Sequence, residues 1–188
     1  MKSFNKIAKF FSRVLELANW ITSGIIFILL IVAVIAPEWT KTHILLTGNN
    51  TVVNVYGFTI QVMTPAGELN MKAVYIYYIV CVILGSLMAM VFRNIHLILK
   101  TADGETWFSK GKTPFQEDVI RMIREIGIFM IAVPVVNIIF NIIARFVVGS
   151  GAELSSQLGH FAIGFAFVCL TQYFAYGEKL EKDTEGLI

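Results

Sequence analysis

The chain alternates long uncharged blocks with segments that hold every Asp, Glu, Lys and Arg. The uncharged blocks are residues 17–37, 73–92, 126–144 and 154–177. A helix needs about 20 mostly apolar residues to cross a hydrocarbon core roughly 30 Å thick, and each block is long enough. The pattern therefore predicts an all-α membrane protein, built as an antiparallel bundle of four transmembrane helices.

One domain, residues 1–188, accounts for the whole pattern, because the segments between the blocks are too broken up to form a separate soluble domain. The predicted spans are about 17–37, 73–92, 126–148 and 157–177. The other segments are an amphipathic interfacial segment (1–16), an outer loop (38–72), a cytoplasmic loop that includes an extension of the third helix (93–125), and a tail (178–188).

The composition supports a membrane protein, since 56% of the residues are hydrophobic and only 15% are charged, against about a quarter charged in soluble domains. Lys and Arg gather in the N-terminal segment, the 93–125 loop and the tail, whereas the outer loop has only Lys41 and Lys72. Because cytoplasmic segments carry the excess of Lys and Arg, we expect a multi-pass protein of the cell (cytoplasmic) membrane with both termini in the cytoplasm. The net charge of +2 gives no reason to expect direct nucleic acid binding.

Residues 1–16 have the spacing of an amphipathic helix. Phe4, Ile7, Ala8 and Phe11 follow i, i+3, i+4, i+7 spacing, and the basic residues occupy the other faces. We expect this helix to lie in the inner membrane interface, attracted by anionic lipid. A docking helix for a partner is the alternative.

The outer loop predicts a small β structure. Runs rich in β-branched residues at 43–47, 51–56 and 58–62 are separated by Gly and Asn, a pattern typical of a hairpin or meander. Because an isolated hairpin is marginally stable, we expect it to pack on the outer end of the bundle. It is either a plain lid or a recognition surface for a peptide or another membrane protein.

A helix start is predicted just before the third span. Thr113 suits the cap, Pro114 suits the first helical position, and Gln116 completes a capping box. Arg121 is placed for ion pairs with the acidic residues four positions before and after it. Since nothing breaks the pattern further on, we expect one helix that starts at Pro114 and continues through the span.

Two stretches carry a family resemblance, WFSKGKTPFQEDVIRMIREIG (107–127) and FAYGEKLEKD (174–183). They resemble the G-x-PF-x-x-EN-x-x-x-LR-x-IG signature and the closing F-x-x-G-x-x-L-x-x-E-x-D segment of a bacterial membrane-protein family, the domain of unknown function 2975. The chain departs from that pattern at Asp118, Gln172 and Tyr176, where the family has Asn, an acidic residue, and Arg or a similar residue.

The resemblance covers the whole four-helix layout, although only these two stretches are specific. The activity of that family is not established, so the resemblance implies no catalytic residue. Some members are encoded beside small helix-turn-helix regulators, which implies a cytoplasmic regulatory protein as partner.

Two groups of residues are candidate sites. Asn137, Asn141 and Arg145 recur every four residues and form one polar stripe on the third span. Polar side chains in a span seldom face lipid, so the stripe serves either interhelical hydrogen bonds or a polar path or cleft that opens outward. The candidate cytoplasmic partner surface consists of Phe115, Glu117, Asp118, Arg121, Arg124, Gly177 and Leu180.

A further set of polar residues lies near the inner ends of the second and fourth spans. We expect them to form an inner polar cluster that serves packing and anchoring, with a ligand site as the alternative. The set consists of Arg93, Asn94, His96, Thr171, Gln172 and Glu178.

No motif for catalysis, metal binding or a cofactor is found, so we expect no enzyme, no metal and no cofactor. The expected function is that of a small integral membrane protein that acts through a protein partner, in a regulatory, sensory or immunity role. The expected partners are the lipid bilayer, a cytoplasmic regulatory protein or another membrane protein, and a second copy of the chain. The alternative is a small transporter or channel component that uses the polar stripe.

Overall fold

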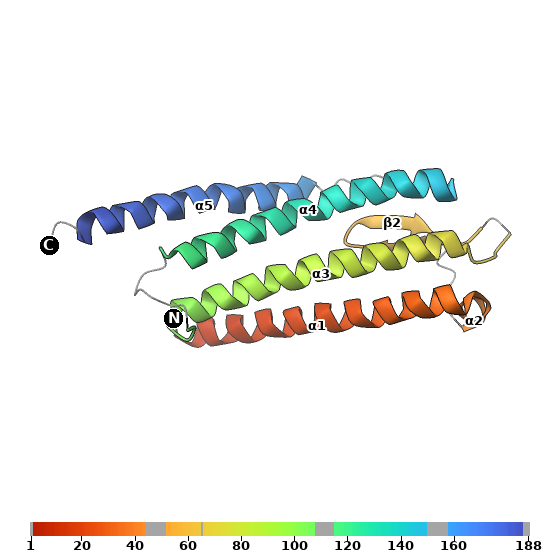
Figure 1. Ribbon diagram of the computed structural model, residues 1–188, viewed down its shortest axis with the longest axis horizontal. Coiled ribbons are helices and arrows are strands. Elements are labelled where there is room, and N and C mark those ends of the chain that lie inside the picture. The colour runs from red at the N-terminus through yellow and green to blue at the C-terminus, as the bar shows by residue number, and fades with distance from the viewer. Residues whose placement is uncertain (1, 44–51, 65, 108–114, 150–157, 186–188) are drawn as a thin grey trace. The chain divides into compact units, whose positions relative to one another are not determined.

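The computed structural model describes residues 2–43, 52–64, 66–107, 115–149 and 158–185 (Figure 1). The elements in chain order are α1 (Lys2–Ile35), α2 (Pro37–His43), β1 (Val52–Val55), β2 (Phe58–Gln61), α3 (Met71–Ala102), α4 (Glu117–Val148) and α5 (Leu158–Glu185). Among the described residues, α1, α3, α4 and α5 are each long and apolar enough to cross a membrane. The prediction of four membrane-spanning helices is confirmed to that extent.

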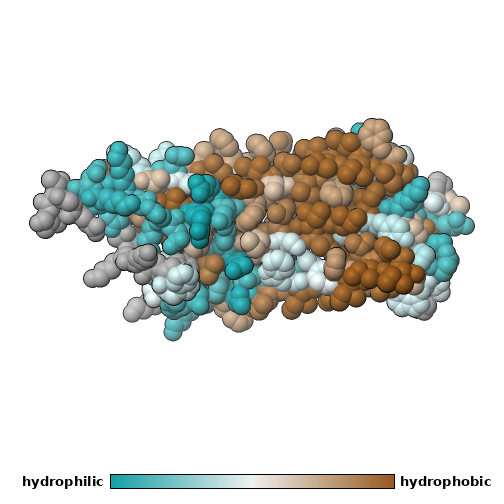
Figure 2. Space-filling view, viewed as in Figure 1, coloured by the Kyte–Doolittle hydropathy of each residue, from teal (hydrophilic) through white to brown (hydrophobic). Residues whose placement is uncertain are grey.

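Large hydrophobic side chains lie on the surface of these helices, and Figure 2 shows how much of the visible surface is hydrophobic. Ile28 of α1, Ile138 of α4 and Phe165 of α5 are all exposed. Apolar surface on this scale is unfavourable in water, whereas lipid tails cover it without loss. The exposed side chains therefore support a multi-pass membrane protein.

The chain forms two compact units, which are described separately. Unit 1 comprises Met1–Asn19, Leu87–Ala132 and Gly159–Ile188, and unit 2 comprises Trp20–Ser86 and Val133–Leu158. Three of the long helices, α1, α3 and α4, contribute one part to each unit.

The core of unit 1 brings together α3, α4 and α5. Val91, Ile126 and Met130 are buried at its centre, and Phe167 of α5 packs against them. Two glycines allow α4 and α5 to approach closely, as small residues do between membrane helices. A Cβ added to Gly164 would lie 2.8 Å from the carbonyl oxygen of Gly127 and 2.9 Å from the backbone nitrogen of Ile131. Backbone therefore meets backbone at this crossing.

The first turns of α1 also belong to unit 1, and they correct one prediction. The helix runs from Lys2 to Ile35 without interruption, so no separate interfacial helix exists. Its polar face contacts the end of α3 instead, since the Lys9 ammonium lies 2.7 Å from both Asp103 and Glu105. Nδ1 of His96 is 3.0 Å from the carbonyl oxygen of Lys9. These charged groups satisfy one another within the chain.

Helix ends extend further than the uncharged blocks predict. Helix α3 continues beyond residue 92 because nothing breaks it before Gly104, which has a φ of 69°. There the amide of Gly104 donates to Thr101 and that of Glu105 donates to Lys100, the two bonds of a Schellman cap. Helix α5 likewise continues through the expected tail to Glu185.

The start of α4 differs from the predicted capping box. The helix begins at Glu117, and the carbonyl of Gln116 accepts the first intrahelical hydrogen bond from Ile120 at 3.0 Å. Gln116 therefore occupies the N-cap position itself. The predicted cap, Thr113, and Pro114 lie outside the described residues.

Unit 2 contains the predicted hairpin. β1 and β2 pair antiparallel, with Val55 opposite Phe58, and Tyr56 and Gly57 form the turn with φ of 45° and 82°. Two consecutive positive φ values identify a type I′ turn, which matches the twist of the strands. The first expected strand is wrong where the structure describes it, because His43 ends α2. Residues 44–47 lie outside the described part of the chain.

Candidate functional site

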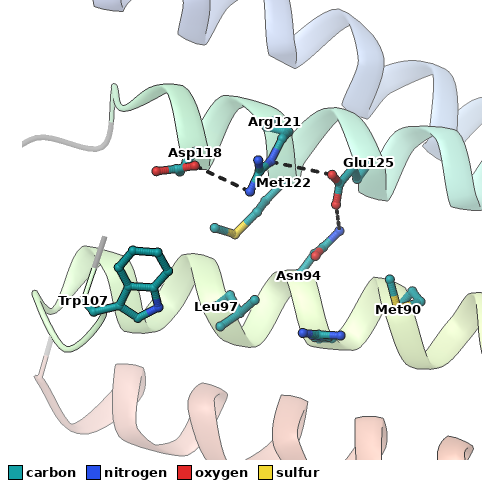
Figure 3. Close-up of a pocket in the computed structure, with 9 residues that line it drawn as sticks. Met90, Asn94, Leu97, Trp107, Asp118, Arg121, Met122 and Glu125 are labelled. Carbon is teal, nitrogen blue, oxygen red and sulfur yellow. Dashed lines mark hydrogen bonds and ion pairs between the residues drawn. The ribbon is translucent and has the colours of Figure 1, made fainter. Parts of the chain in front are cut away.

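A pocket of about 650 Å³ lies between α3 and α4 in unit 1 (Figure 3). This volume falls within the usual range for small-molecule sites, roughly 300 to 1,000 Å³. On each helix the lining residues follow i, i+3, i+4, i+7 spacing, so each helix contributes one face. The lining consists of Met90, Arg93, Asn94 and Leu97 on α3, Trp107 after it, and Asp118, Arg121, Met122 and Glu125 on α4.

A chain of polar contacts crosses this α3–α4 pocket, as the dashed lines in Figure 3 show. The Arg121 guanidinium lies 3.5 Å from Asp118 and 3.7 Å from Glu125. The amide of Asn94, which is buried, donates to Glu125 at 3.0 Å. Both carboxylates of the lining are therefore engaged. Arg93 is exposed and makes no ion pair within the part of the chain that the structure describes. The two arginines and two carboxylates of the lining balance in charge, and Arg93 is the charged side chain that stays outside the ion pairs.

The α4–α5 seam, formed by Phe115, Phe174, Gly177 and the ion pairs beside them, is a second feature of unit 1. The rings of Phe115 and Phe174 have centroids 5.6 Å apart. A Cβ added to Gly177 would lie 2.6 Å from the Phe115 ring, so glycine leaves the space that the ring occupies. The seam joins segments that are far apart in the sequence.

Charges flank the α4–α5 seam. The Lys182 ammonium lies 2.7 Å from Glu178 on its own helix and 3.5 Å from Glu117 at the start of α4. The Lys182 and Glu117 side chains are 64% and 82% exposed, where solvent screens their ion pair, whereas Glu178 is 17% exposed. The ion pairs therefore orient the seam more than they stabilise it.

The predicted partner surface divides between these two features. Phe115, Glu117 and Gly177 belong to the α4–α5 seam, whereas Asp118 and Arg121 turn toward α3 and line the pocket. Arg124 and Leu180 are exposed. Of the two predicted ion pairs of Arg121, the one with Glu125 is present, and Asp118 takes the place of the other acid.

Four members of the expected inner polar cluster make their contacts outside that cluster. Asn94 pairs with Glu125 across the α3–α4 pocket, whereas His96 faces α1. The Thr171 hydroxyl donates to the carbonyl of Phe167 on its own helix. The carboxylate of Glu178, the one acid of that set, accepts from Lys182 of its own helix.

The polar stripe of α4 has an unexpected partner in unit 2. Nδ2 of Asn137 donates to the carbonyl oxygen of Tyr56, in the turn of the hairpin, at 3.0 Å. Asn137 is 2% exposed, and it precedes the end of α4 by about three turns, roughly 16 Å at 1.5 Å per residue. The hairpin turn therefore lies alongside α4 and not over its end, which corrects the expected placement (Figure 1).

This contact explains why an Asn stands in an apolar helix. A carbonyl buried away from water needs a donor, and the backbone of α4 has none to spare. Burial also raises the pKa of the Tyr56 hydroxyl above its ordinary value. Further along the stripe, Asn141 is buried with its carbonyl oxygen unpartnered among the described residues, and Arg145 is exposed.

Sequence reasoning missed the α3–α4 pocket. The available signal was the matched spacing of Arg93 and Asn94 just past an uncharged block and of Asp118 and Arg121 before another. In the described segments, no group of three or more His, Cys, Asp and Glu could hold a metal ion.

Neither a protein-family model, nor a curated protein, nor a solved structure matches the chain. Membership of the domain of unknown function 2975 family therefore stays a prediction.

Proposed function

We propose that the chain is a non-enzymatic membrane protein that acts through a cytoplasmic protein, which it binds at the α4–α5 seam. The observation that carries the proposal is the assembly of the seam itself. Phe115 and Glu117 precede Gly177 and Lys182 by some sixty residues, yet they meet, and charged side chains remain exposed around them.

Charge supports a cytoplasmic location for the seam. Unit 1 contains the basic N-terminal segment, the basic residues that follow α3, and those at the end of α5. Cytoplasmic flanks of membrane helices carry this excess of Lys and Arg. Four spans with this flank inside give an antiparallel bundle with both termini in the cytoplasm.

The side chains beside the seam are of the types that anchor protein interfaces. Tyr173, Tyr176 and Leu180 recur at i, i+3, i+7 on α5 and are 76%, 63% and 48% exposed. Aromatic residues of this kind dominate hot spots, while charged rims set specificity and association rate. Arg124 and Glu117 are the nearby exposed charges on α4. A regulatory or sensory role suits a membrane protein whose contact surface faces the cytoplasm. In an immunity role the same surface would bind another protein.

The proposal is tested by chemical crosslinking and affinity capture from native membranes. The wild type is compared with a seam variant in which Phe115, Glu117, Arg124 and Leu180 are all changed to Ala. A matched control changes the same number of exposed lipid-facing residues, for example Ile128 and Ile138, with two more on α4. A protein captured by the wild type and the control, and lost in the seam variant, supports the proposal. Equal capture by all three contradicts it.

The alternative of a small transporter or channel component is favoured by one observation. Asn141 is 4% exposed and its carbonyl oxygen has no partner among the described residues. A polar group in that state is a candidate for contact with a permeating solute or water. Solute flux into liposomes that falls on Asn141→Leu, with folding preserved, would support the alternative over the partner-binding role.

A further inference from the structure

We infer that the α3–α4 pocket binds an anionic phospholipid, with Arg93 contacting the phosphate of the headgroup and the apolar side chains of the pocket contacting the first part of the acyl chains. This site is separate from the α4–α5 seam, and it depends on the helices being embedded in a bilayer with the basic flank of unit 1 on the cytoplasmic side.

One guanidinium of the pocket favours an anionic headgroup. Arg121 is shared between Asp118 and Glu125, and Glu125 is held additionally by Asn94. Arg93 alone keeps its guanidinium without an ionic partner among the described residues. A guanidinium presents paired N–H donors that match the oxygens of a phosphate. The Arg93 guanidinium is thus available to one anionic group.

The order of apolar and charged lining residues along the helices favours an amphiphilic ligand over a water-soluble anion. Met90 belongs to the uncharged block 73–92, and Arg93 is the first charged residue after it. Leu97 of α3 and Met122 of α4 add apolar surface beside the charged groups, and Figure 3 shows Met122 directed toward α3. A ligand that fills this pocket needs an apolar part next to its negative charge.

The position of the pocket favours a lipid over an acidic segment of a protein. The pocket lies between two helices long and apolar enough to cross a membrane, at the place where the uncharged stretch of each one ends. Lipids reach such a position laterally, without leaving the bilayer. Anionic lipids are also concentrated next to cytoplasmic flanks rich in Lys and Arg.

The test measures lipid retention on the purified full chain by native mass spectrometry. Phosphatidylglycerol and phosphatidylcholine with identical acyl chains are the two probes. Arg93→Gln removes the cation, and Arg124→Gln is the matched control because Arg124 is an exposed arginine of α4 outside the pocket. A second variant, Leu97→Trp, fills the pocket and keeps Arg93.

The wild type and Arg124→Gln are expected to retain phosphatidylglycerol several-fold better than phosphatidylcholine. Arg93→Gln should weaken phosphatidylglycerol binding roughly tenfold, the effect of losing one charge-assisted contact, and Leu97→Trp should weaken binding of both lipids. Equal retention of the two lipids by the wild type overturns the inference, and so does an equal loss in both arginine variants. Undiminished binding to Leu97→Trp places the lipid outside the pocket. Displacement by inorganic phosphate or by an acidic peptide identifies a free anion or a protein segment as the occupant instead.

Discussion

Gly127 and Gly164 face each other where α4 crosses α5, and each lacks the Cβ that would meet the other's backbone. A Cβ on Gly127 would lie 2.9 Å from the carbonyl oxygen of Gly164, and the reverse distance is 2.8 Å. Neither atom is the end of a flexible side chain, so the helices themselves would have to separate. This crossing therefore sets the register in which the start of α4 reaches the end of α5.

Gly164→Ala should destabilise the protein by about 1 to 3 kcal/mol, the usual effect of overpacking a tight contact. Gly159→Ala on the same helix is the matched control, because a Cβ there has nothing within 4 Å. The control should be neutral or slightly stabilising, since Ala favours helix over Gly. Thermal unfolding in detergent, followed by circular dichroism, measures both. Equal melting temperatures for the two variants would show that the crossing is not tight.

Gly177→Val should disrupt the α4–α5 seam without unfolding the bundle. The added side chain would meet the ring of Phe115, which can rotate away, so the effect on the melting temperature should be smaller than for Gly164→Ala. The effect on partner capture should be larger, because the ring no longer covers the end of α5. Gly24→Val is the control, since Gly24 has open space around it. A Gly177→Val variant that captures the partner normally would remove the seam from the proposed function.

Asn137→Ala should release the hairpin turn from α4. Hydrogen bonds of this kind in membrane proteins contribute about 0.6 kcal/mol on average and up to about 1.7 kcal/mol. Limited proteolysis of the hairpin should therefore accelerate several-fold, while the helices stay intact. Ile138→Ala, an exposed neighbour on α4, should leave the cleavage rate unchanged. Protection that survives in Asn137→Ala would mean that packing of the buried Phe58 and Ile60 holds the hairpin unaided.

Lys9→Gln should loosen the first turns of α1 from the end of α3. The Lys9 side chain is only 13% exposed and serves both Asp103 and Glu105, although the two acids are more exposed, so the loss of overall stability should be small. Hydrogen exchange of the backbone amides at the start of α1 should rise, and high salt should produce the same rise in the wild type. Lys6→Gln, an exposed neighbour, is the control. Unchanged exchange in Lys9→Gln would assign the docking of α1 to its apolar contacts.

The four long apolar helices and the hairpin could be predicted because both depend on local patterns. Uncharged length predicts a membrane helix, and β-branched runs on either side of Tyr56 and Gly57 predict two strands and a turn. Helix ends were harder, because polar and charged residues appear from Arg93 onward, yet nothing breaks the helix before Gly104. Charge marks where a span leaves the bilayer and does not mark where the helix stops.

The candidate sites depend on how helices are rotated against each other, which local patterns do not specify. Asp118 and Arg121 were predicted on one surface with Phe115, but the rotation of α4 turns them toward α3. The partner of Asn137 lies about eighty residues earlier in the chain, in a turn whose position on α4 no local signal reveals. The α3–α4 pocket likewise exists only once two separate helical faces are brought together.

The proposed role of the α4–α5 seam is tested most directly by photocrosslinking in living cells. A photoreactive amino acid is placed at Arg124 or Leu180, which are exposed beside the seam, and at Ile128 or Phe165, which are exposed on the apolar surfaces of the same helices. The account predicts a discrete adduct with a cytoplasmic protein from the first two positions only, and its loss when Gly177→Val is added. Adducts of equal yield from all four positions, or no protein adduct from Arg124 and Leu180, would contradict it.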